Sequence, residues 1–285
     1  MSRVGSGLLA GKHLLVTGVA TTDSLAFATA AAALYQGAEV ALGVFPRDLE
    51  RATEAARSLP RPVPLLALDL TDADQVAEVG AWVRAHWPAL DGALHAAAFA
   101  PRDALGGRFT SAAMDGIATA FHTSTYTYVT LGGLLESLAP ASGGSLVGLD
   151  FDAAGAWPVY NWMGVCKAAL EAANRYLARD LGPRGIRSNL VAAGPLTTRA
   201  AGGIPGFDLL LDAWAGRSPL PWDPTDGGAV ADAVCFLLSD LSRMVTGHIL
   251  HVDGGYHAMA APLAPAGHSA HPDHAGPSDP APRGA

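Results

Sequence analysis

The stretch HLLVTGVATTDSLAFATAAAALYQ, residues 13–36, decides the fold because it reads as a strand, a turn and a helix in that order. His13–Thr17 is a short apolar run, which is typical of a buried strand. Gly18 opens a polar turn, and the alanine-rich segment Leu25–Gln36 has apolar residues at helical spacing. A strand followed directly by a helix is the first half of a βαβ unit.

The same alternation continues along the chain. Further apolar runs predict strands, and helical patterns such as that of Asp72–His86 lie between them. Several runs are apolar throughout, as expected for strands covered by helices on both faces. The predicted strands are His13–Thr17, Glu39–Val44, Pro64–Leu68, Gly92–Ala96, Ser145–Asp150, Arg187–Ala192 and His248–Val252. We therefore predict an α/β fold in which residues 1–259 form a single doubly wound (Rossmann) domain around a seven-stranded parallel sheet.

The composition changes after Met259. Residues 260–285 are rich in proline, alanine and histidine and contain no aromatic residue. Such a segment buries too little apolar surface to offset the entropy that it would lose on ordering. We expect a disordered C-terminal tail there.

The overall composition excludes several classes of protein. The chain has 285 residues, of which 50% are hydrophobic and 15% charged, so it has enough apolar residues for a large core. The net charge of −8 argues against a nucleic-acid partner, since phosphates require a basic surface. Cys166 and Cys235 are too few for a disulfide framework or a zinc site, and we expect no metal. The sequence has no signal-peptide pattern and no apolar run of about 18 residues, the length that spans a membrane, which predicts a cytoplasmic protein.

The turn after the first strand has the features of a phosphate site. Gly18 permits a tight turn, and Ser24 is placed to cap the next helix and to donate its hydroxyl to a phosphate. The positive end of the helix dipole adds to the attraction. The turn lacks the second and third glycines of the G-x-G-x-x-G fingerprint, so an ordinary helix cap is an equally good interpretation of this segment alone.

Other strand ends carry residues that suit a dinucleotide. Phe45 follows the second strand and is suited to cover an adenine, while Arg47 is placed to meet a 2′-phosphate. Asp69 closes the third strand as an acceptor for the adenine amine. The small residues Ala96–Ala98 allow the backbone to approach a ribose, and the turn Gly194–Thr198 offers hydroxyls to a nicotinamide carboxamide. Each feature has an ordinary structural explanation, but their placement at successive strand ends predicts a dinucleotide site.

Tyr160 and Lys167 are candidates for catalysis. They are seven residues apart, nearly two helical turns or about 10.5 Å at roughly 1.5 Å per residue, so a helix presents both on one face. Pro158 predicts where this helix begins, because the first turn needs no internal N–H donor. The lysine can hold cofactor hydroxyls while the phenol donates to a forming oxyanion. Considered alone, such a pair is usually only part of a solvated helix face.

Together these motifs are similar to those of the short-chain dehydrogenase/reductase superfamily, and within it to the enoyl-[acyl-carrier-protein] reductase (NADH) family. The resemblance covers residues 7–259 and is strongest to the mycobacterial members of that family. It rests on the turn Gly18-x5-Ser24-x-Ala26 and on the spacing Tyr160-x2-Met163-x3-Lys167. Ordinary ketoreductases of the superfamily differ, because they have a lysine where this chain has Gly164 and a serine where it has Val147.

The resemblance implies roles for individual residues. Tyr160 would be the oxyanion donor, Lys167 the anchor of the ribose and Phe151 the gate beside the nicotinamide. The implied cofactor-binding residues are Gly18, Ser24, Leu25, Phe45, Asp69, Leu70, Ala97, Ala98, Lys167, Gly194, Leu196 and Thr198. The substrate-binding residues, drawn also from segment 199–222, are Tyr160, Met163, Phe207 and Leu211. The implied cofactor is NADH, the partner is an enoyl substrate carried by acyl carrier protein, and the assembly is a homotetramer.

Segment 199–222 is expected to cover the acyl chain. Its glycines and Pro205 predict an irregular first half, which suits the hinge of a lid. In the second half Phe207, Leu210, Leu211 and Trp214 recur at helical spacing and form one apolar face. This face either roofs a hydrophobic acyl slot or only packs on the core. The segment is shorter than in the mycobacterial enzymes that the chain resembles, so their chain-length preference does not carry over.

These features predict NADH-dependent reduction of a trans-2-enoyl thioester in type II fatty acid synthesis. Phe45 offers no acceptor to a ribose 2′-hydroxyl and Arg47 is the only nearby cation, and the resemblance favours NADH over NADPH. Two alternatives remain open. One is a short-chain reductase acting on another conjugated carbonyl in secondary metabolism. The other is a dinucleotide-sensing module without catalysis, which the presence of both Tyr160 and Lys167 disfavours.

Overall fold

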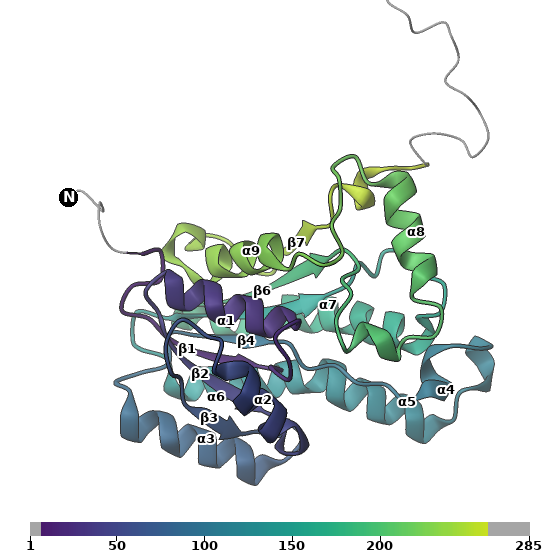
Figure 1. Ribbon diagram of the computed structural model, residues 1–285. Coiled ribbons are helices and arrows are strands. Elements are labelled where there is room, and N and C mark those ends of the chain that lie inside the picture. The colour runs from purple at the N-terminus through teal and green to yellow at the C-terminus, as the bar shows by residue number, and fades with distance from the viewer. Residues whose placement is uncertain (1–6, 262–285) are drawn as a thin grey trace, which may run out of the picture.

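Residues 7–261, the part of the chain that the computed structural model describes, form one parallel sheet with helices on both faces (Figure 1). The strand order is β3-β2-β1-β4-β5-β6-β7, and every neighbouring pair is parallel. The strands are β1 His13–Thr17, β2 Glu39–Val44, β3 Leu65–Ala67, β4 Gly92–His95, β5 Gly144–Asp150, β6 Ile186–Ala193 and β7 Ile249–Val252. The predicted α/β fold with a seven-stranded parallel sheet is confirmed, and each predicted strand ends within one residue of the observed one.

Two layers of helices cover the sheet. α1 and α9 pack against each other on one face, and α3, α6 and α7 lie on the other face (Figure 1). The α-helices are α1 Leu25–Tyr35, α2 Leu49–Ala56, α3 Ala73–His86, α4 Arg102–Leu105, α5 Met114–Phe121, α6 Thr127–Leu138, α7 Asn161–Leu181, α8 Asp208–Arg217 and α9 Gly228–Leu238. A π-helical turn, His122–Tyr126, joins α5 to α6.

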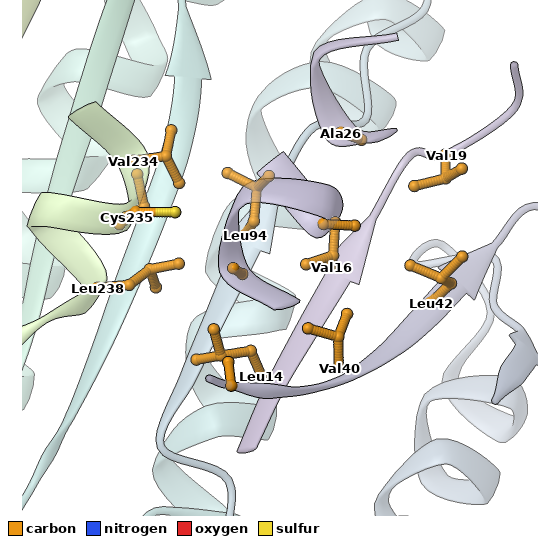
Figure 2. Packing of buried hydrophobic residues seen from close by; sticks show 14 of the residues in the cluster. Leu14, Val16, Val19, Ala26, Val40, Leu42, Leu94, Val234, Cys235 and Leu238 are labelled. Atoms are coloured by element: carbon orange, nitrogen blue, oxygen red, sulfur yellow. The ribbon is translucent and has the colours of Figure 1, made fainter. Parts of the chain in front are cut away.

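The core has one half on each side of the sheet, because successive residues of a strand point to opposite faces. Leu14 and Val16 of β1 belong to the half under α1 and α9, whereas Leu15 between them belongs to the half under α3, α6 and α7. Figure 2 shows the first half, in which Leu14, Val16 and Leu94 lie near Val234 of α9. Strands that are apolar throughout thus supply both halves.

The strand order reverses between β1 and β4, and at such a point doubly wound sheets bind ligands in a crevice at the carboxyl ends of the strands. The two strand ends approach each other closely there. Gly18 has a φ of 87° and donates its amide to the carbonyl of Gly43. A Cβ atom on Gly18 would lie 2.3 Å from the carbonyl oxygen of Ala96, so only glycine fits this turn.

The prediction that the α7 helix begins at Pro158 is wrong. Pro158 starts a turn, and the helix begins at Asn161. Val159 and Asn161 have φ angles of 59° and 38°, left-handed values that side chains of their kind rarely adopt, so the chain turns before α7 and the helix starts from a left-handed Asn161. Tyr160 therefore lies at the position that caps α7, and Lys167 lies within the helix.

The tail predicted for residues 260–285 lies, apart from its first two residues, outside the part of the chain that the structure describes. Across residues 7–261, no helix combines the length and the apolar character that crossing a bilayer requires.

Candidate active site

Tyr160 lies in a buried cluster of apolar side chains. The cluster includes Met163 and Cys166 of α7, and the Tyr160 ring centroid is 5.2 Å from that of Phe151. Burial, with a further contribution from the negative charge of Asp150, raises the pKa of the Tyr160 phenol above its ordinary value. The phenol is therefore protonated at neutral pH and is a hydrogen-bond donor.

Lys167 is buried next to the end of β5. Its Nζ atom donates a hydrogen bond of 2.8 Å to the carbonyl oxygen of Leu149 and lies 4.0 Å from Oδ1 of Asp150. Burial lowers the pKa of the Lys167 amine, and the charge of Asp150 opposes that change. Both partners belong to the carboxyl end of β5, so the sheet itself positions the amine.

The turn between β1 and α1 forms a helix terminus that faces the crevice. Ser24 is the N-cap of α1, and its hydroxyl accepts a hydrogen bond from the amide of Phe27 and donates one to the carbonyl of Thr21. Helix geometry leaves the amides of Leu25 and Ala26 without an acceptor inside the helix. These two amides and the positive end of the helix dipole suit a phosphate. The Ser24 hydroxyl is used in capping α1, and its predicted donation to a phosphate stays a prediction.

The Arg47 guanidinium lies over the rings of Phe45 and Phe99. Both rings are partly exposed, and the Arg47 guanidinium carbon lies 4.8 Å from the Phe45 centroid and 6.0 Å from the Phe99 centroid. Phe45 follows β2 and Phe99 follows β4, so the two rings frame the crevice at the carboxyl edge. Two exposed rings that a planar cation contacts are a place where another flat group, such as an adenine, would also stack.

Several predicted cofactor residues have structural partners of their own. Oδ1 of Asp69 accepts hydrogen bonds of 2.9 and 2.7 Å from the amide and hydroxyl of Thr71. Leu70 is buried in the core under α3 and α6. Ala97 is half-buried and Ala98 is exposed after β4. Asp69 thus stabilises the turn before α3, and its use as an adenine acceptor stays a prediction.

Gly194 follows β6 at a crowded point. A Cβ atom there would lie 2.8 Å from the indole nitrogen of Trp214 and 2.8 Å from a ring carbon of Trp222. The Trp222 indole also donates to the carbonyl of Pro195. Beyond this point, Leu196 is buried, and the hydroxyl of Thr198 accepts from the amide of Ala201. The two indoles leave no room for a side chain at position 194, which explains why this residue is glycine. Contact of this turn with a nicotinamide stays a prediction.

Segment 199–222 contains the predicted helix, α8, and a short 3₁₀ turn before it at Ala201–Gly203. Leu210 and Trp214 of α8 are buried. Phe207 is the N-cap of the helix, and Phe207 and Leu211 are only half-buried. The predicted apolar face is therefore carried mainly by Leu210 and Trp214.

Trp214 joins α8 to a group of aromatic rings around Phe151. Its centroid lies 5.6 Å from Phe151 and 5.2 Å from Trp157, and it stacks on Tyr256 at 3.8 Å. The Trp214 indole donates a hydrogen bond of 3.0 Å to the carbonyl of Asp253. The rings of Tyr160, Phe151 and Trp214 of α8 thus belong to one continuous aromatic group, in which Tyr160 contacts Phe151.

Four residues of this site were missed from the sequence, namely Phe99, Asp150, Trp157 and Tyr256. Phe99 follows the Ala96–Ala98 segment, so its position after a strand end was a usable signal. Asp150 ends a strand beside Phe151 and carried the same signal. Trp157 and Tyr256 are distant in sequence, and no local pattern indicates that they meet.

The donor set fits a nicotinamide dinucleotide. The N-terminus of α1 suits the pyrophosphate, the Phe45 and Phe99 rings suit a flat base, and the buried amine of Lys167 suits ribose hydroxyls. These groups follow β1, β2, β4 and β5 along one edge of the sheet.

A doubly wound parallel sheet with a buried tyrosine and lysine at its carboxyl edge defines a reductase of the short-chain dehydrogenase/reductase superfamily. The chain belongs to the enoyl-(acyl carrier protein) reductase family, which it matches over residues 18–257. It is 41% identical over 270 residues to the NADH enoyl-[acyl-carrier-protein] reductase of Mycolicibacterium smegmatis, with 88% of this chain and 97% of the relative covered. Enzymes of the same name from Mycobacterium avium and Neisseria meningitidis are each 38% identical, over 88% of this chain and 97% and 96% of their own lengths.

Proposed function

We propose that the protein is an NADH-dependent enoyl-[acyl-carrier-protein] reductase of type II fatty acid synthesis. The observation that carries this proposal is the placement of a protonated phenol, Tyr160, and a buried amine, Lys167, next to the end of β5. The relatives from three bacterial species, each named for this activity, support the same proposal.

In this mechanism, bound NADH supplies the hydride that reduces the β-carbon of the enoyl thioester. Negative charge develops on the thioester oxygen, and Tyr160 donates a hydrogen bond to that oxygen. Because the phenol is already held in a buried site, its donation stabilises the transition state more than the substrate. Lys167 holds the ribose hydroxyls, and its positive charge lowers the energy of the anion. Phe151 keeps water away from one side of the reacting atoms.

The assay that tests this function follows loss of the reduced-nicotinamide absorbance with a trans-2-enoyl thioester as substrate. Turnover of enoyl thioesters carried by acyl carrier protein, with little turnover of ketones or other conjugated carbonyls, is the expected result. Faster turnover of a conjugated ketone would favour a reductase of secondary metabolism. Binding of NADH without turnover of any substrate would favour a sensing module.

We infer that NADH is preferred over NADPH. The Arg47 side chain lies over Phe45, and its Nε atom is 3.9 Å from Oδ2 of Asp48, whose other oxygen contacts Arg51. Its charge is therefore partly compensated. The ratio of kcat/KM for the two cofactors tests this, and Arg47→Ala should leave the preference for NADH unchanged. Better kinetics with NADPH, reversed by Arg47→Ala, would contradict the inference.

We also propose that the protein is a homotetramer that acts in the cytoplasm. Large apolar side chains are exposed on α5, the π-helical turn and α7, which adjoin one another: Met114, Phe121, Tyr126, Val165 and Tyr176. Apolar surface gathered in this way usually marks a protein–protein contact. Light scattering should give the mass of four chains, and Val165→Glu, which puts a charge among these exposed apolar residues, should lower it. A monomer at micromolar concentration would contradict the proposal.

A further inference from the structure

Asp150, the last residue of β5, is a buried carboxylate to which no side chain of the described chain donates a hydrogen bond. Apart from the charge of Lys167, only the backbone amide of Phe151 lies near enough to lower its pKa. Its side chain is 0% exposed. Within residues 7–261 neither carboxylate oxygen has a hydrogen-bond partner. Buried polar groups are nearly always paired, so an unpaired carboxylate in the interior points to a role other than folding.

Lys167 is the nearest opposite charge. Its Nζ atom lies 4.0 Å from Oδ1 of Asp150, beyond hydrogen-bond distance, while it donates to the carbonyl of Leu149 at 2.8 Å. The interaction of Asp150 with Lys167 is therefore one of charge rather than of a shared proton. At this separation in a buried site it is strong enough to change protonation.

The other titratable groups around this pair do not supply a competing positive charge. Acidic or thiol groups near it are Glu171 and Cys166 on α7, and Asp152 just after β5. The phenols of Tyr128 and Tyr160 have pKa values raised above the ordinary value by burial and remain neutral. Burial lowers the pKa of His95 on β4 to about 3, so this ring is neutral as well.

Asp150 and Lys167 change each other's pKa in opposite directions. Burial is the largest influence on both groups: it lowers the pKa of Lys167 and raises that of Asp150 to about 7. The charge of each partner opposes these shifts. Without a carboxylate at position 150, only the smaller influence of Cys166 would oppose burial, and the Lys167 amine would lose its proton at a lower pH.

Such a pair does not improve folding. Replacing a buried ion pair by well-packed apolar groups is often neutral or stabilising. A purely structural role at the end of β5 would therefore be met as well by an uncharged side chain. The carboxylate and the amine are retained beside Phe151 and Tyr160, where the chemistry of the site takes place.

We propose that Asp150 is a positioning residue that keeps Lys167 in its ammonium form, so that the lysine can hold the cofactor ribose. This inference rests on the proposed function, because it assigns Lys167 to the cofactor. Asp150 acts through Lys167 and need not touch the substrate.

The test is the affinity for NADH as a function of pH, measured by fluorescence for the wild type and for Asp150→Asn. In the wild type, affinity should persist to alkaline pH. In Asp150→Asn, affinity should be lost at a pH lower by about one unit or more. At a pH between the two transitions, the Kd of Asp150→Asn for NADH should therefore be about tenfold weaker than that of the wild type. Asp152→Asn is the matched control: it removes the same charge two residues away, at a carboxylate 3.7 Å from His251, and should follow the wild type.

Coincident curves for the wild type and Asp150→Asn, or an equal shift in Asp152→Asn, would overturn the proposal. Asp150→Glu keeps a carboxylate and should retain most of the wild-type affinity for NADH at alkaline pH. If Asp150→Asn does not fold, Asp150→Ser replaces it as the neutral variant, with thermal melting as the check of folding. Failure of the wild type to bind NADH at any pH would count against the proposed function instead, so the two ideas fail differently.

Discussion

Tyr160 and Lys167 are both buried, but burial has opposite consequences for their protonation. It raises the pKa of the phenol and so preserves the proton that Tyr160 donates. It lowers the pKa of the amine and so threatens the charge that Lys167 needs. The surroundings differ accordingly: Tyr160 lies among apolar side chains, whereas Lys167 lies beside a carboxylate.

Replacing Tyr160 and Lys167 separates the two roles. Tyr160→Phe should bind NADH normally and reduce enoyl thioesters about 100- to 1000-fold more slowly, since one oxyanion donor is lost. Lys167→Ala should lose NADH binding. Titration calorimetry for NADH and single-turnover kinetics measure the two effects. Loss of NADH binding in Tyr160→Phe together with normal binding in Lys167→Ala would reverse the assignment.

A second prediction concerns Gly194. Gly194→Ala would place a methyl group 2.8 Å from the indoles of both Trp214 and Trp222, so one of them must move. Overpacking of this kind costs about 1–3 kcal/mol, which thermal or urea unfolding would detect. Gly202→Ala, where nothing lies within 4 Å of the new Cβ, is the control and should leave the free energy of unfolding nearly unchanged. Equal stability of the two variants would contradict the inference that Trp214 and Trp222 crowd position 194.

At the scale of elements, α8 is held against the C-terminal turn rather than against the sheet. Trp214 stacks on Tyr256, and the Arg217 guanidinium lies 4.3 Å from the Tyr256 centroid and donates to the carbonyl of Met259. Figure 1 shows α8 beside the yellow end of the described chain. In the first half of segment 199–222, Ala201 is buried and Ile204 packs against the cluster around Tyr160, whereas nothing lies within 4 Å of a Cβ atom built on Gly202 or Gly203.

The position of α8 predicts a limit on the length of the acyl chain. Each buried methylene contributes about 0.8 kcal/mol, so kcat/KM should rise with chain length until the lid covers no more of the chain, at about eight to twelve carbons. Trp214→Leu, which removes a ring beside Phe151, should move this plateau to longer chains. Leu209→Ala, an exposed position on the same helix, should not. A steady climb through the longest soluble thioesters in the wild type would show that α8 does not limit the site.

At the scale of the whole molecule, buried charges make stability depend on pH. The folded state holds the pKa of His95 at about 3, against 6.5 unfolded, so below pH 6.5 the unfolded chain binds a proton that the folded protein does not. The contribution of His95 to stability is therefore complete above pH 6.5 and is lost as the pH falls towards 3. Asp150, with a pKa raised from 3.8 to about 7, acts in the opposite sense: its contribution is complete below pH 3.8 and is lost as the pH rises to 7.

His95→Asn should therefore remove a slope of up to about 1.4 kcal/mol per pH unit in the free energy of unfolding between pH 4 and 6. The remaining curve should fall as the pH rises, because Asp150 still titrates. Urea unfolding at several pH values measures both slopes. His86→Asn, at an exposed position on α3, is the control. An unchanged slope in His95→Asn would show that His95 does not govern acid stability.

The sheet could be predicted from the sequence because strands such as Glu39–Val44 are buried on both faces and so are apolar throughout. The start of α7 could not, since Val159 and Asn161 take left-handed conformations that side chains of their kind rarely adopt. The unpaired state of Asp150 depends on packing between β5 and α7, and the stack of Trp214 on Tyr256 joins distant segments. Interactions of this kind leave no local pattern in a sequence.

The two ends of the described chain differ in what they are attached to. At the start, the amides of Leu8 and Leu9 bond to Gln36, at the far end of α1 from the crevice. At the other end, Tyr256 and Met259 are bound to Arg217, so a pull on the chain at Met259 acts directly on α8. Tethering the enzyme to a solid support through its N-terminus should therefore leave turnover intact, whereas tethering it through its C-terminus should lower turnover, because the load reaches α8.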